Sequence, residues 1–290
     1  MKNIKDLVSV IIPTYNRAEL IARSVQSILK QTYKNIELII VDDGSTDNTE
    51  EIVKKFDDSR VIYIKQENQG ACAARNNGID YAKGEFIAFQ DSDDVWHEDK
   101  LEKQINCLKG TGADMCFCCM RQINDHTCSE IIGNKFKNGF ISSSVSVLGI
   151  GTQSFCAYSY VFKTEKFDDG MPRLQDFEIM IRIQRKFKIY YMDVALVDYY
   201  IQDDSISSNP KKLVMACEMI LNKHNNNLTK ECRKEMAFLL LRDGFLLKSR
   251  CLQINNFNLA YKLYPFWQTK ARILAYKFGV YWLYKKVKHL

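Results

Sequence analysis

The sequence predicts an α/β fold in which helices cover both faces of a mostly parallel sheet, followed by a C-terminal helical region. Two features of the first hundred residues indicate the sheet: short apolar runs alternate with helical patterns, and polar residues directly follow the apolar runs. Residues 211–290 carry helical patterns throughout. We therefore expect two regions, residues 1–210 and residues 211–290.

The elements of the first hundred residues alternate regularly. Two segments, Asn16-Arg-Ala-Glu19 and Asp47-Asn-Thr-Glu50, place a capping residue three positions before a glutamate, which is typical of a helix start. Strands joined by helices in this way form right-handed crossovers and hence a parallel sheet. The predicted strands are Val8–Ile12, Ile36–Val41, Val61–Ile64 and Glu85–Gln90, and the predicted helices are Asn16–Leu29, Asp47–Phe56 and Ala71–Ala82.

The second part of the chain has a less regular order. Residues 127–159 are rich in Gly and Ser, and we expect a loop region with one or two strands there. The other predicted elements before residue 210 are a helix at Asp99–Leu108, a buried strand at Met115–Met120, a helix at Asp176–Phe187 and a strand at Ile189–Tyr200. The C-terminal helices are expected at Lys211–Asn222, Leu228–Arg250, Asn258–Leu263 and Trp267–Lys288.

The length and composition are those of an enzyme-sized globular chain. The 290 residues are 46% hydrophobic and 12% aromatic, which excludes a disordered or low-complexity protein. No apolar run approaches the roughly 18–20 residues that cross a bilayer. The run Val8–Ile12 stops at Pro13 without a small-residue cleavage site, which argues against a secretory signal. We expect a cytoplasmic protein.

The net charge of +6 conceals an uneven distribution. Residues 211–290 contain sixteen Lys and Arg against four Asp and Glu, a net charge of about +12, so that residues 1–210 carry about −6. Basic residues interleaved with aromatic ones are typical of helices that lie on an anionic membrane surface. The alternative is a helical cap that packs its aromatic residues on the N-terminal region. Nucleic-acid binding is disfavoured because the predicted strand ends are acidic.

Ten cysteines are spread along the chain, and Cys116 and Cys119 stand at the spacing of a zinc-binding pair, with His126 and Cys128 as conceivable further ligands. In a strand, however, residues three positions apart face opposite ways and cannot share a metal ion. We therefore interpret the cysteines as free thiols that act as small apolar residues in a reducing compartment.

Polar residues end all four N-terminal strands. The carboxyl ends of parallel strands meet at one edge of a sheet, and ligands of such sheets bind there. We therefore expect a site built from Pro13-Thr-Tyr-Asn-Arg17, Asp42-Asp43-Gly44-Ser45, Glu67-Asn68 and Asp91-Ser92-Asp93.

Asp91 and Asp93 are two positions apart, so that in extended geometry both carboxylates face the same way and can bind one divalent cation. Carboxylate oxygens suit Mg²⁺ or Mn²⁺, which take further ligands from water and from substrate phosphates. The alternative is a solvated turn that is rich in aspartate.

Two other features have both a functional and a structural interpretation. A carboxylate of Asp42 or Asp43 can accept a hydrogen bond from a uracil imide or a ribose hydroxyl, whereas Gly44 and Ser45 also suit an ordinary turn. Arg75 is either a solvated charge on its helix or a phosphate ligand that points toward the predicted site.

Four stretches together resemble the family 2 glycosyltransferases with a GT-A fold, such as bacterial enzymes of capsule, O-antigen and exopolysaccharide synthesis. They are Val8–Asn16, Val41–Asp47, Ala74–Gly84 and Phe89–Asp94. The resemblance implies transfer of a sugar from a nucleotide diphosphate donor, with UDP as the expected nucleotide, and inversion at the anomeric carbon. It implies that Mn²⁺ or Mg²⁺ is bound by Asp93, with Asp91 beside it and near the ribose. The implied nucleotide-binding residues are Pro13, Thr14, Tyr15, Arg17, Asp42, Arg75 and Asp91.

The family also has a general base in a segment with the shape Glu-Asp, an apolar helix and an Arg. Leu174-Gln-Asp-Phe-Glu-Ile-Met-Ile-Arg182 resembles this segment, with Gln175 in the place of the usual acid. The resemblance therefore implies that Asp176 is the catalytic base, and Glu178 is the nearby alternative. Family members often have a His after the strand that ends at Tyr200, where this chain reads Ile201-Gln-Asp-Asp-Ser.

These observations predict a metal-dependent inverting glycosyltransferase at the inner face of the cell membrane that extends a glycan or a lipid-linked acceptor. One alternative is a sugar nucleotidyltransferase, but the stretch after the first strand has no glycine-rich phosphate loop. The other is a non-catalytic binding protein with the same fold, against which the intact Asp42, Asp91, Asp93 and Asp176 argue.

Overall fold

The computed structural model describes residues 3–124, 127–132, 136–201, 209–247, 249–266, 269–270 and 273–274. The chain divides into two compact units. The first, which we call the N-terminal unit, comprises Met1–Ser143, Gly149–Gly170 and Gln175–Gln202. The second, which we call the helical unit, comprises Ser144–Leu148, Met171–Leu174 and Asp203–Leu290. The helical unit thus includes two short segments that come from the middle of the chain.

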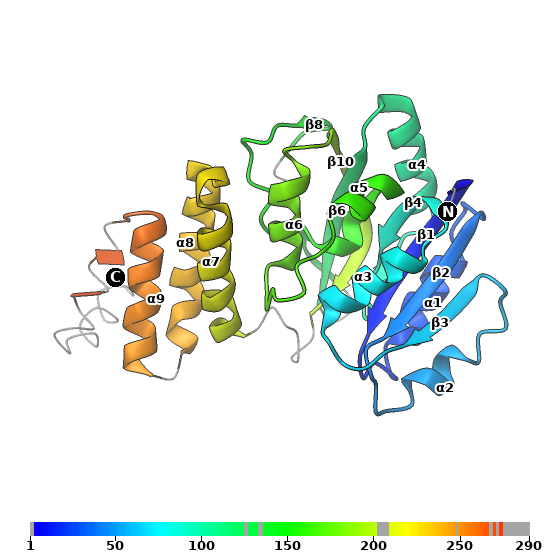
Figure 1. Ribbon diagram of the computed structural model, residues 1–290, viewed down its shortest axis with the longest axis horizontal. Helices are drawn as coiled ribbons and strands as arrows, with labels where there is room; N and C mark the ends of the chain where they lie inside the picture. Colours follow the sequence, from blue (N-terminus) through cyan, green and yellow to red (C-terminus); the bar gives the residue numbers. More distant parts are fainter. Residues whose placement is uncertain are drawn as a thin grey trace. The chain divides into compact units, whose positions relative to one another are not determined.

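The N-terminal unit is built on a sheet that has ten strands in the described part of the chain (Figure 1). Its order is β3-β2-β1-β4-β9-β6-β10-β5, while β7 pairs with β6 and β8 pairs with β10. Strands β3, β2, β1 and β4 are mutually parallel, as are β6 and β10, and β9 runs antiparallel between β4 and β6. The strands are β1 (Ile4–Thr14), β2 (Ile36–Asp42), β3 (Val61–Lys65), β4 (Gly84–Phe89), β5 (Val95–Trp96), β6 (Met115–Asn124), β7 (Thr127–Ile132), β8 (Gly139–Ile141), β9 (Phe155–Tyr158) and β10 (Ile189–Tyr200).

Helices lie on both faces of this sheet because β1 and β2 are apolar on both sides. Val10 and Leu38 belong to the same buried cluster as Val25 of α1 and Leu101 of α4. On the opposite face, α3 packs so closely on β1 that a Cβ atom at Gly78 would lie 2.5 Å from Cγ2 of Ile11. The helices of this unit are α1 (Ile21–Leu29), α2 (Thr49–Val53), α3 (Ala71–Tyr81), α4 (Lys100–Thr111), α5 (Ser159–Thr164) and α6 (Gln175–Ile183). The expected α/β architecture is confirmed.

The two predicted capping boxes are wrong. Helix α1 begins at Ile21, and Asn16, which has a φ of 50°, accepts a hydrogen bond from the amide of Thr46 (2.8 Å) instead. Helix α2 has Asn48 at its N-cap and ends at Val53, while Glu50 binds Lys54 and Lys65. Asn16 thus binds the loop after β2. Asp47 does bind the start of α2, because its carboxylate accepts a hydrogen bond from the amide of Thr49 (3.0 Å), but Glu50 does not complete the box. The described part of residues 127–159 contains three strands rather than one or two.

The helical unit contains α7 (Pro210–His224), α8 (Lys230–Asp243) and α9 (Arg250–Leu263). The long helix expected over Leu228–Arg250 is interrupted by a short 3₁₀ helix at Gly244–Leu246, and α9 begins eight residues before the expected Asn258. Within the unit, Arg173 binds Asp243 (3.2 Å). No helix among the described residues is long and apolar enough to span a bilayer. Most of the helix expected at 267–288 lies outside the described residues.

Candidate active site

The carboxyl ends of β1, β2 and β4 meet at one edge of the sheet, as expected. Thr14, the last residue of β1, is the register partner of Asp42, the last residue of β2. The amide of Gln90, which follows β4, donates to the carbonyl of Ile11 in β1 (3.0 Å). The parallel register therefore brings the three loops that begin at residues 14, 42 and 90 to the same place.

The loops after β1 and β2 are joined by several hydrogen bonds. The amide of Asp43 donates to the carbonyl of Thr14 (2.8 Å), and the amide of Asn16 donates to the hydroxyl of Ser45 (2.9 Å). The amide of Arg17 donates to the hydroxyl of Thr49 (3.0 Å). Pro13 and Thr14 are buried, whereas Tyr15 is 46% exposed. Of these expected nucleotide-binding residues, the aromatic ring of Tyr15 is the one that is freely accessible for stacking.

Asp42 is fully buried, and its carboxylate binds groups of the protein itself. One oxygen accepts a hydrogen bond from the amide of Ser45 (2.7 Å), and the other accepts one from the hydroxyl of Tyr63. Burial and the hydrogen bond to Asp42 raise the pKa of Tyr63. In this structure Asp42 therefore stabilises the turn at the end of β2, and its contact with a nucleoside stays a prediction.

The neighbouring Asp43 has a different set of partners. Its carboxylate accepts hydrogen bonds from the amides of Gln69 (2.9 Å) and Gly70 (2.7 Å), directly before α3. It also accepts one from the side chain of Gln66 (2.8 Å). The two adjacent acids thus hold two different loops.

Residues Asp91–Asp94 after β4, which we call the acidic segment, place three carboxylates close together in a partly buried position. Burial, together with the charge of Asp91, raises the pKa of Asp93 to about 6. The guanidinium of Arg17 lies 4.0 Å from the Asp93 carboxylate, and Arg23 donates to the Asp93 carbonyl. Asp94 is 1% exposed, and burial raises its pKa well above the ordinary value. A place that disfavours several neighbouring negative charges is one that a divalent cation stabilises.

The carboxylates of Asp91 and Asp93 suit a divalent cation that takes only some of its ligands from the protein. Asp91 and Asp93 supply hard oxygen ligands, as Mg²⁺ and Mn²⁺ require. No group of three or more His, Cys, Asp or Glu side chains among the described residues could hold a metal ion by itself. A cation at these two residues must therefore take its other ligands from water or from a phosphate-bearing substrate.

Arg75 connects the acidic segment with the start of α6. Its guanidinium donates to Oδ1 of Asp91 (2.8 Å) and to Oε1 of Gln175 (2.9 Å), and it lies 5.5 Å from the ring centre of Phe167. Arg75 is 6% exposed, so the interpretation of a solvated helix charge is wrong. Gln175 stands at the position where the resemblance places an acidic residue, and its neutral side-chain oxygen accepts the hydrogen bond from Arg75.

The structure separates the two candidate bases on α6. Asp176 is partly exposed at the start of the helix, and its Oδ1 accepts a hydrogen bond from the amide of Phe177 (2.8 Å). Burial raises the pKa of Asp176 to about 6, although the amide of Phe177 and the charge of Arg75 act in the opposite direction. Glu178 is 2% exposed and binds Arg182 (2.9 Å). Glu178 is therefore buried and paired, whereas Asp176 is the more accessible of the two candidates.

Three residues at this site carry no recognisable signal in the sequence. The hydroxyl of Thr152 lies 3.5 Å from Oδ1 of Asp91, and Nε2 of the Gln153 side chain donates to Oδ2 of Asp94 (2.9 Å). Both belong to a short 3₁₀ helix, Thr152–Ser154, in the region expected to be mostly loop. The third is Arg23, whose guanidinium lies 3.9 Å from the ring centre of Tyr200. Because 59 to 70 residues separate these side chains from their partners in the acidic segment, no local pattern reveals them.

The expectation for Cys116 and Cys119 agrees with the structure. Cys116 pairs across the sheet with Cys156, while the sulfur of Cys119 lies 2.8 Å from the hydroxyl of Tyr191. The cysteines for which the structure describes side chains are free thiols.

The chain belongs to glycosyl transferase family 2, because the model of this family matches residues 9–167. The matched segment includes β1 from Ser9 onward, all of β2, β3 and β4, the acidic segment and Arg75. The protein is therefore a glycosyltransferase, and its fold is the expected GT-A fold.

Curated relatives agree with the family. The chain is 35% identical over 221 residues to the putative teichuronic acid biosynthesis glycosyltransferase TuaG of Bacillus subtilis, an alignment that covers 73% of this chain and 86% of the relative. It is 50% identical over 103 residues to the Escherichia coli enzyme WfgD, a UDP-Glc:alpha-D-GlcNAc-diphosphoundecaprenol beta-1,3-glucosyltransferase. That second alignment covers 35% of this chain and 41% of the relative.

Solved structures show the same fold. Residues 1–349 of Staphylococcus aureus TarS in complex with UDP-GlcNAc give a TM-score of 0.68 at 21% identity, with 91% of this chain and 82% of that chain covered. The mannosyltransferase PcManGT from Pyrobaculum calidifontis, in complex with GDP-Man and Mn²⁺, gives a TM-score of 0.61 at 16% identity, with 94% and 82% covered.

Proposed function

We propose that the protein transfers a sugar, with inversion, from a UDP-sugar to a glycan or lipid-linked acceptor in cell-surface polysaccharide synthesis. One observation carries this proposal. Arg75 binds both Asp91, in the acidic segment, and Gln175, which immediately precedes Asp176. The group expected at the donor diphosphate and the group expected at the acceptor hydroxyl are therefore held together by one side chain. The relatives named as enzymes of teichuronic acid and lipid-linked glycan synthesis support the choice of acceptor.

In the proposed reaction the acceptor oxygen attacks the anomeric carbon of the donor while the bond from that carbon to the diphosphate oxygen breaks. The proton of the acceptor hydroxyl passes to the carboxylate of Asp176. A base with a pKa of about 6 is mostly ionised at neutral pH, and it is more basic than an ordinary aspartate. Removal of this proton in the transition state typically contributes about 10²–10⁴-fold to the rate.

The departing diphosphate carries negative charge that the protein has to stabilise. Asp91 and Asp93 would hold Mn²⁺ or Mg²⁺, which when bound supplies Lewis-acid stabilisation of that charge. Arg17 lies beside Asp93, and Arg75 lies beside Asp91. These guanidinium groups add positive charge at the same edge of the sheet and orient the two carboxylates.

A screen of nucleotide-sugars for metal-dependent hydrolysis tests the proposal, because slow transfer to water requires no known acceptor. We expect release of UDP from one UDP-sugar in the presence of Mn²⁺ or Mg²⁺, and loss of this release with a chelator or in Asp91→Asn. UDP should also raise the melting temperature only when the cation is present. Equal stabilisation by UDP with and without chelator would contradict the metal site.

We further propose that the basic C-terminal region brings the enzyme to the inner face of the membrane, where a lipid-linked acceptor lies. The support is the net charge of about +12 over residues 211–290. Within the helical unit, however, Phe257 is fully buried and lies 5.4 Å from the ring of Phe245, so at least this aromatic residue serves as core. Sedimentation with vesicles that contain anionic lipid, against neutral vesicles, tests the contact. Equal binding to both would contradict it.

A further inference from the structure

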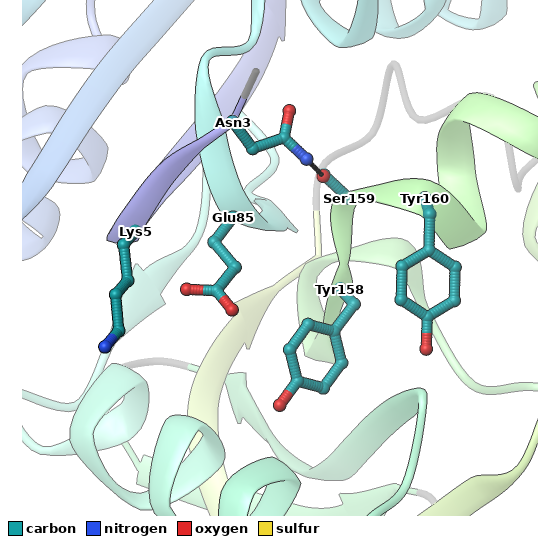
Figure 2. Close-up of a pocket in the computed structure, with 6 residues that line it drawn as sticks. All are labelled: Asn3, Lys5, Glu85, Tyr158, Ser159 and Tyr160. Carbon is teal, nitrogen blue, oxygen red and sulfur yellow. Dashed lines mark hydrogen bonds between the residues drawn. The ribbon is translucent and has the colours of Figure 1, made fainter.

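A concave site lies at the end of the sheet where β1 and β4 begin, opposite the end that carries the candidate active site. It has a volume of about 470 Å³ and is lined by Asn3, Lys5, Glu85, Tyr158, Ser159 and Tyr160 (Figure 2). Lys5 lies at the start of β1, whereas the active-site loop follows Thr14 at its end. At about 3.3 Å for each residue of a strand, the two sites are roughly 30 Å apart. This pocket, which we call the rear pocket, is therefore separate from the donor site.

A β-bulge in β1 shapes one side of the rear pocket. The register between β1 and β4 shifts between Ile4 and Val8, and Asp6 within the bulge has a φ of 59°. The amide of Asp6 donates to Oε2 of Glu85 (2.8 Å), and its carboxylate binds Lys109. Bulges redirect neighbouring side chains, and a non-glycine residue at positive φ persists only where the surroundings hold it in place.

Two tyrosine rings form the other side of the rear pocket. The rings of Tyr158 and Tyr160 are nearly parallel, at 13°, with centres 5.7 Å apart. Tyr158 also packs on Phe86, at 4.7 Å between ring centres, and the hydroxyl of Tyr160 binds Asp114. Tyr160 nevertheless remains 45% exposed. The structure thus presents an aromatic surface that is fixed in place before any ligand arrives.

The polar groups around these rings include both donors and acceptors of hydrogen bonds. In Figure 2 the carboxylate of Glu85 lies in view between Lys5 and Tyr158, and Nδ2 of the Asn3 side chain donates to the hydroxyl of Ser159 (2.6 Å). Lys5 and Glu85 are the two charged residues among the six that line the rear pocket. One positive and one negative side chain leave little net charge at the pocket, which disfavours a phosphate or another strongly charged ligand.

We infer that the rear pocket binds a pyranose ring of a neutral oligosaccharide. The apolar face of such a ring packs on an exposed aromatic ring, while its hydroxyl groups exchange hydrogen bonds with Lys5 and Glu85. The inference rests on the proposed function in one respect: a glycan held here would keep its acceptor end at a high effective concentration near the same protein. The pocket would then favour repeated use of a glycan chain over release after one transfer.

Isothermal titration of the full chain with maltopentaose and with chitopentaose, two neutral oligosaccharides, tests the inference. We expect millimolar binding of at least one of them, and the same binding in the presence of UDP and Mn²⁺. Tyr160→Ala should weaken this binding about three- to tenfold, because the aromatic face is lost. Tyr160→Phe retains the ring and loses the hydrogen bond to Asp114, so it should bind nearly as the parent does.

Two further variants keep the outcome unambiguous. Lys5→Ala leaves the aromatic core intact and should weaken binding even if Tyr160→Ala does not fold. Tyr81→Ala removes an aromatic residue that is 55% exposed and does not line the rear pocket, and it should bind as the parent does. Absence of binding to both oligosaccharides, competition by UDP, or equal weakening by Tyr81→Ala would overturn the inference.

The parallel hydrolysis assay separates this inference from the proposed function. Asp91→Asn should lose hydrolysis of the nucleotide-sugar and retain oligosaccharide binding. If the parent binds the oligosaccharide and hydrolyses no nucleotide-sugar, the proposed function is wrong and the rear pocket stands.

Discussion

The guanidinium of Arg75 donates a 2.8 Å hydrogen bond to the carboxylate of Asp91, and only 7% of the arginine side chain is exposed. Because Arg75 also binds Gln175, this one contact links α3, the loop after β4 and the start of α6. Arg75 therefore fixes the position of Asp91, on the donor side of the proposed site, relative to Gln175, which precedes the proposed base on the acceptor side. Its removal should therefore affect both sides.

Arg75→Ala should lower the rate of donor hydrolysis by about two orders of magnitude, because it removes the hydrogen bonds to both Asp91 and Gln175 and so leaves both side chains free to move. Arg75→Lys retains the charge but cannot form the two-armed contact, and it should recover only part of the rate. The measurement is kcat and KM for hydrolysis of the active nucleotide-sugar. Arg60→Ala is the matched control, since Arg60 pairs with Asp58 (2.7 Å) away from this site and should leave the rate unchanged. Equal losses in the two alanine variants would contradict the role of Arg75.

Asp176→Asn should lower kcat by about 10²–10⁴-fold, because the proton acceptor is lost, and should bind UDP as the parent does. Glu178→Gln should act differently, since it breaks a buried contact with Arg182. We expect it to lower the free energy of unfolding by about 1–3 kcal/mol and to retain the chemical step in the folded fraction. Turnover at different nucleotide-sugar concentrations and urea unfolding of both variants check this pair. Normal turnover by Asp176→Asn would assign the base elsewhere.

The pH dependence of activity and that of stability should have opposite signs at Asp176. The base must be ionised, so kcat should fall as the pH drops through about 6. The folded protein holds this proton more tightly than an unfolded chain, in which an aspartate has a pKa of about 3.9. The contribution of Asp176 to stability should therefore be least favourable above pH 6 and should improve as the pH falls toward 4.

Asp176→Asn provides the control for this pH dependence. An uncharged side chain removes the cost of holding a charge in this partly buried place, so the variant should gain about 1–3 kcal/mol of stability relative to the parent at pH 8, and less at pH 5. Unfolding curves in urea at the two pH values measure the difference. A gain that is the same at both values would show that ionisation of Asp176 is not its cause.

Gly78→Ala should destabilise the N-terminal unit by about 1–3 kcal/mol, because the added methyl group would overlap Ile11 of β1. Gly110, in the exposed part of α4, has no atom within 4 Å of an added Cβ. Gly110→Ala should therefore stabilise the protein by about 0.5–1 kcal/mol, the usual gain of alanine over glycine in a helix. Urea unfolding compares the two. A stabilised Gly78→Ala would mean that α3 can move away from the sheet at little cost.

Much of the N-terminal unit could be predicted from local sequence. Strand β10 has the expected bounds, Ile189–Tyr200, because a long apolar run between polar segments has few other ways to bury its side chains. The helix starts were predicted less well. Asn16 and Glu50 each belong to a segment with the spacing of a capping box, yet Asn16 binds the amide of Thr46 in the loop after β2 and Glu50 binds Lys65 at the end of β3. Such competing contacts cannot be recognised in a short window of sequence.

The chain by itself determined which acidic residues end the parallel strands, because the order of apolar runs fixes the topology and the topology brings those ends together. Only the tertiary structure decided what each acid does. Asp42 accepts hydrogen bonds from Ser45 and Tyr63, and Glu178 pairs with Arg182. Arg75 binds Gln175, which lies 100 positions further along the chain. The physical reason is range. The apolar pattern of a strand or helix can be recognised within a few residues of sequence, whereas a charge or a hydrogen-bonding group is paired by whatever the folded chain places within about 3 Å of it.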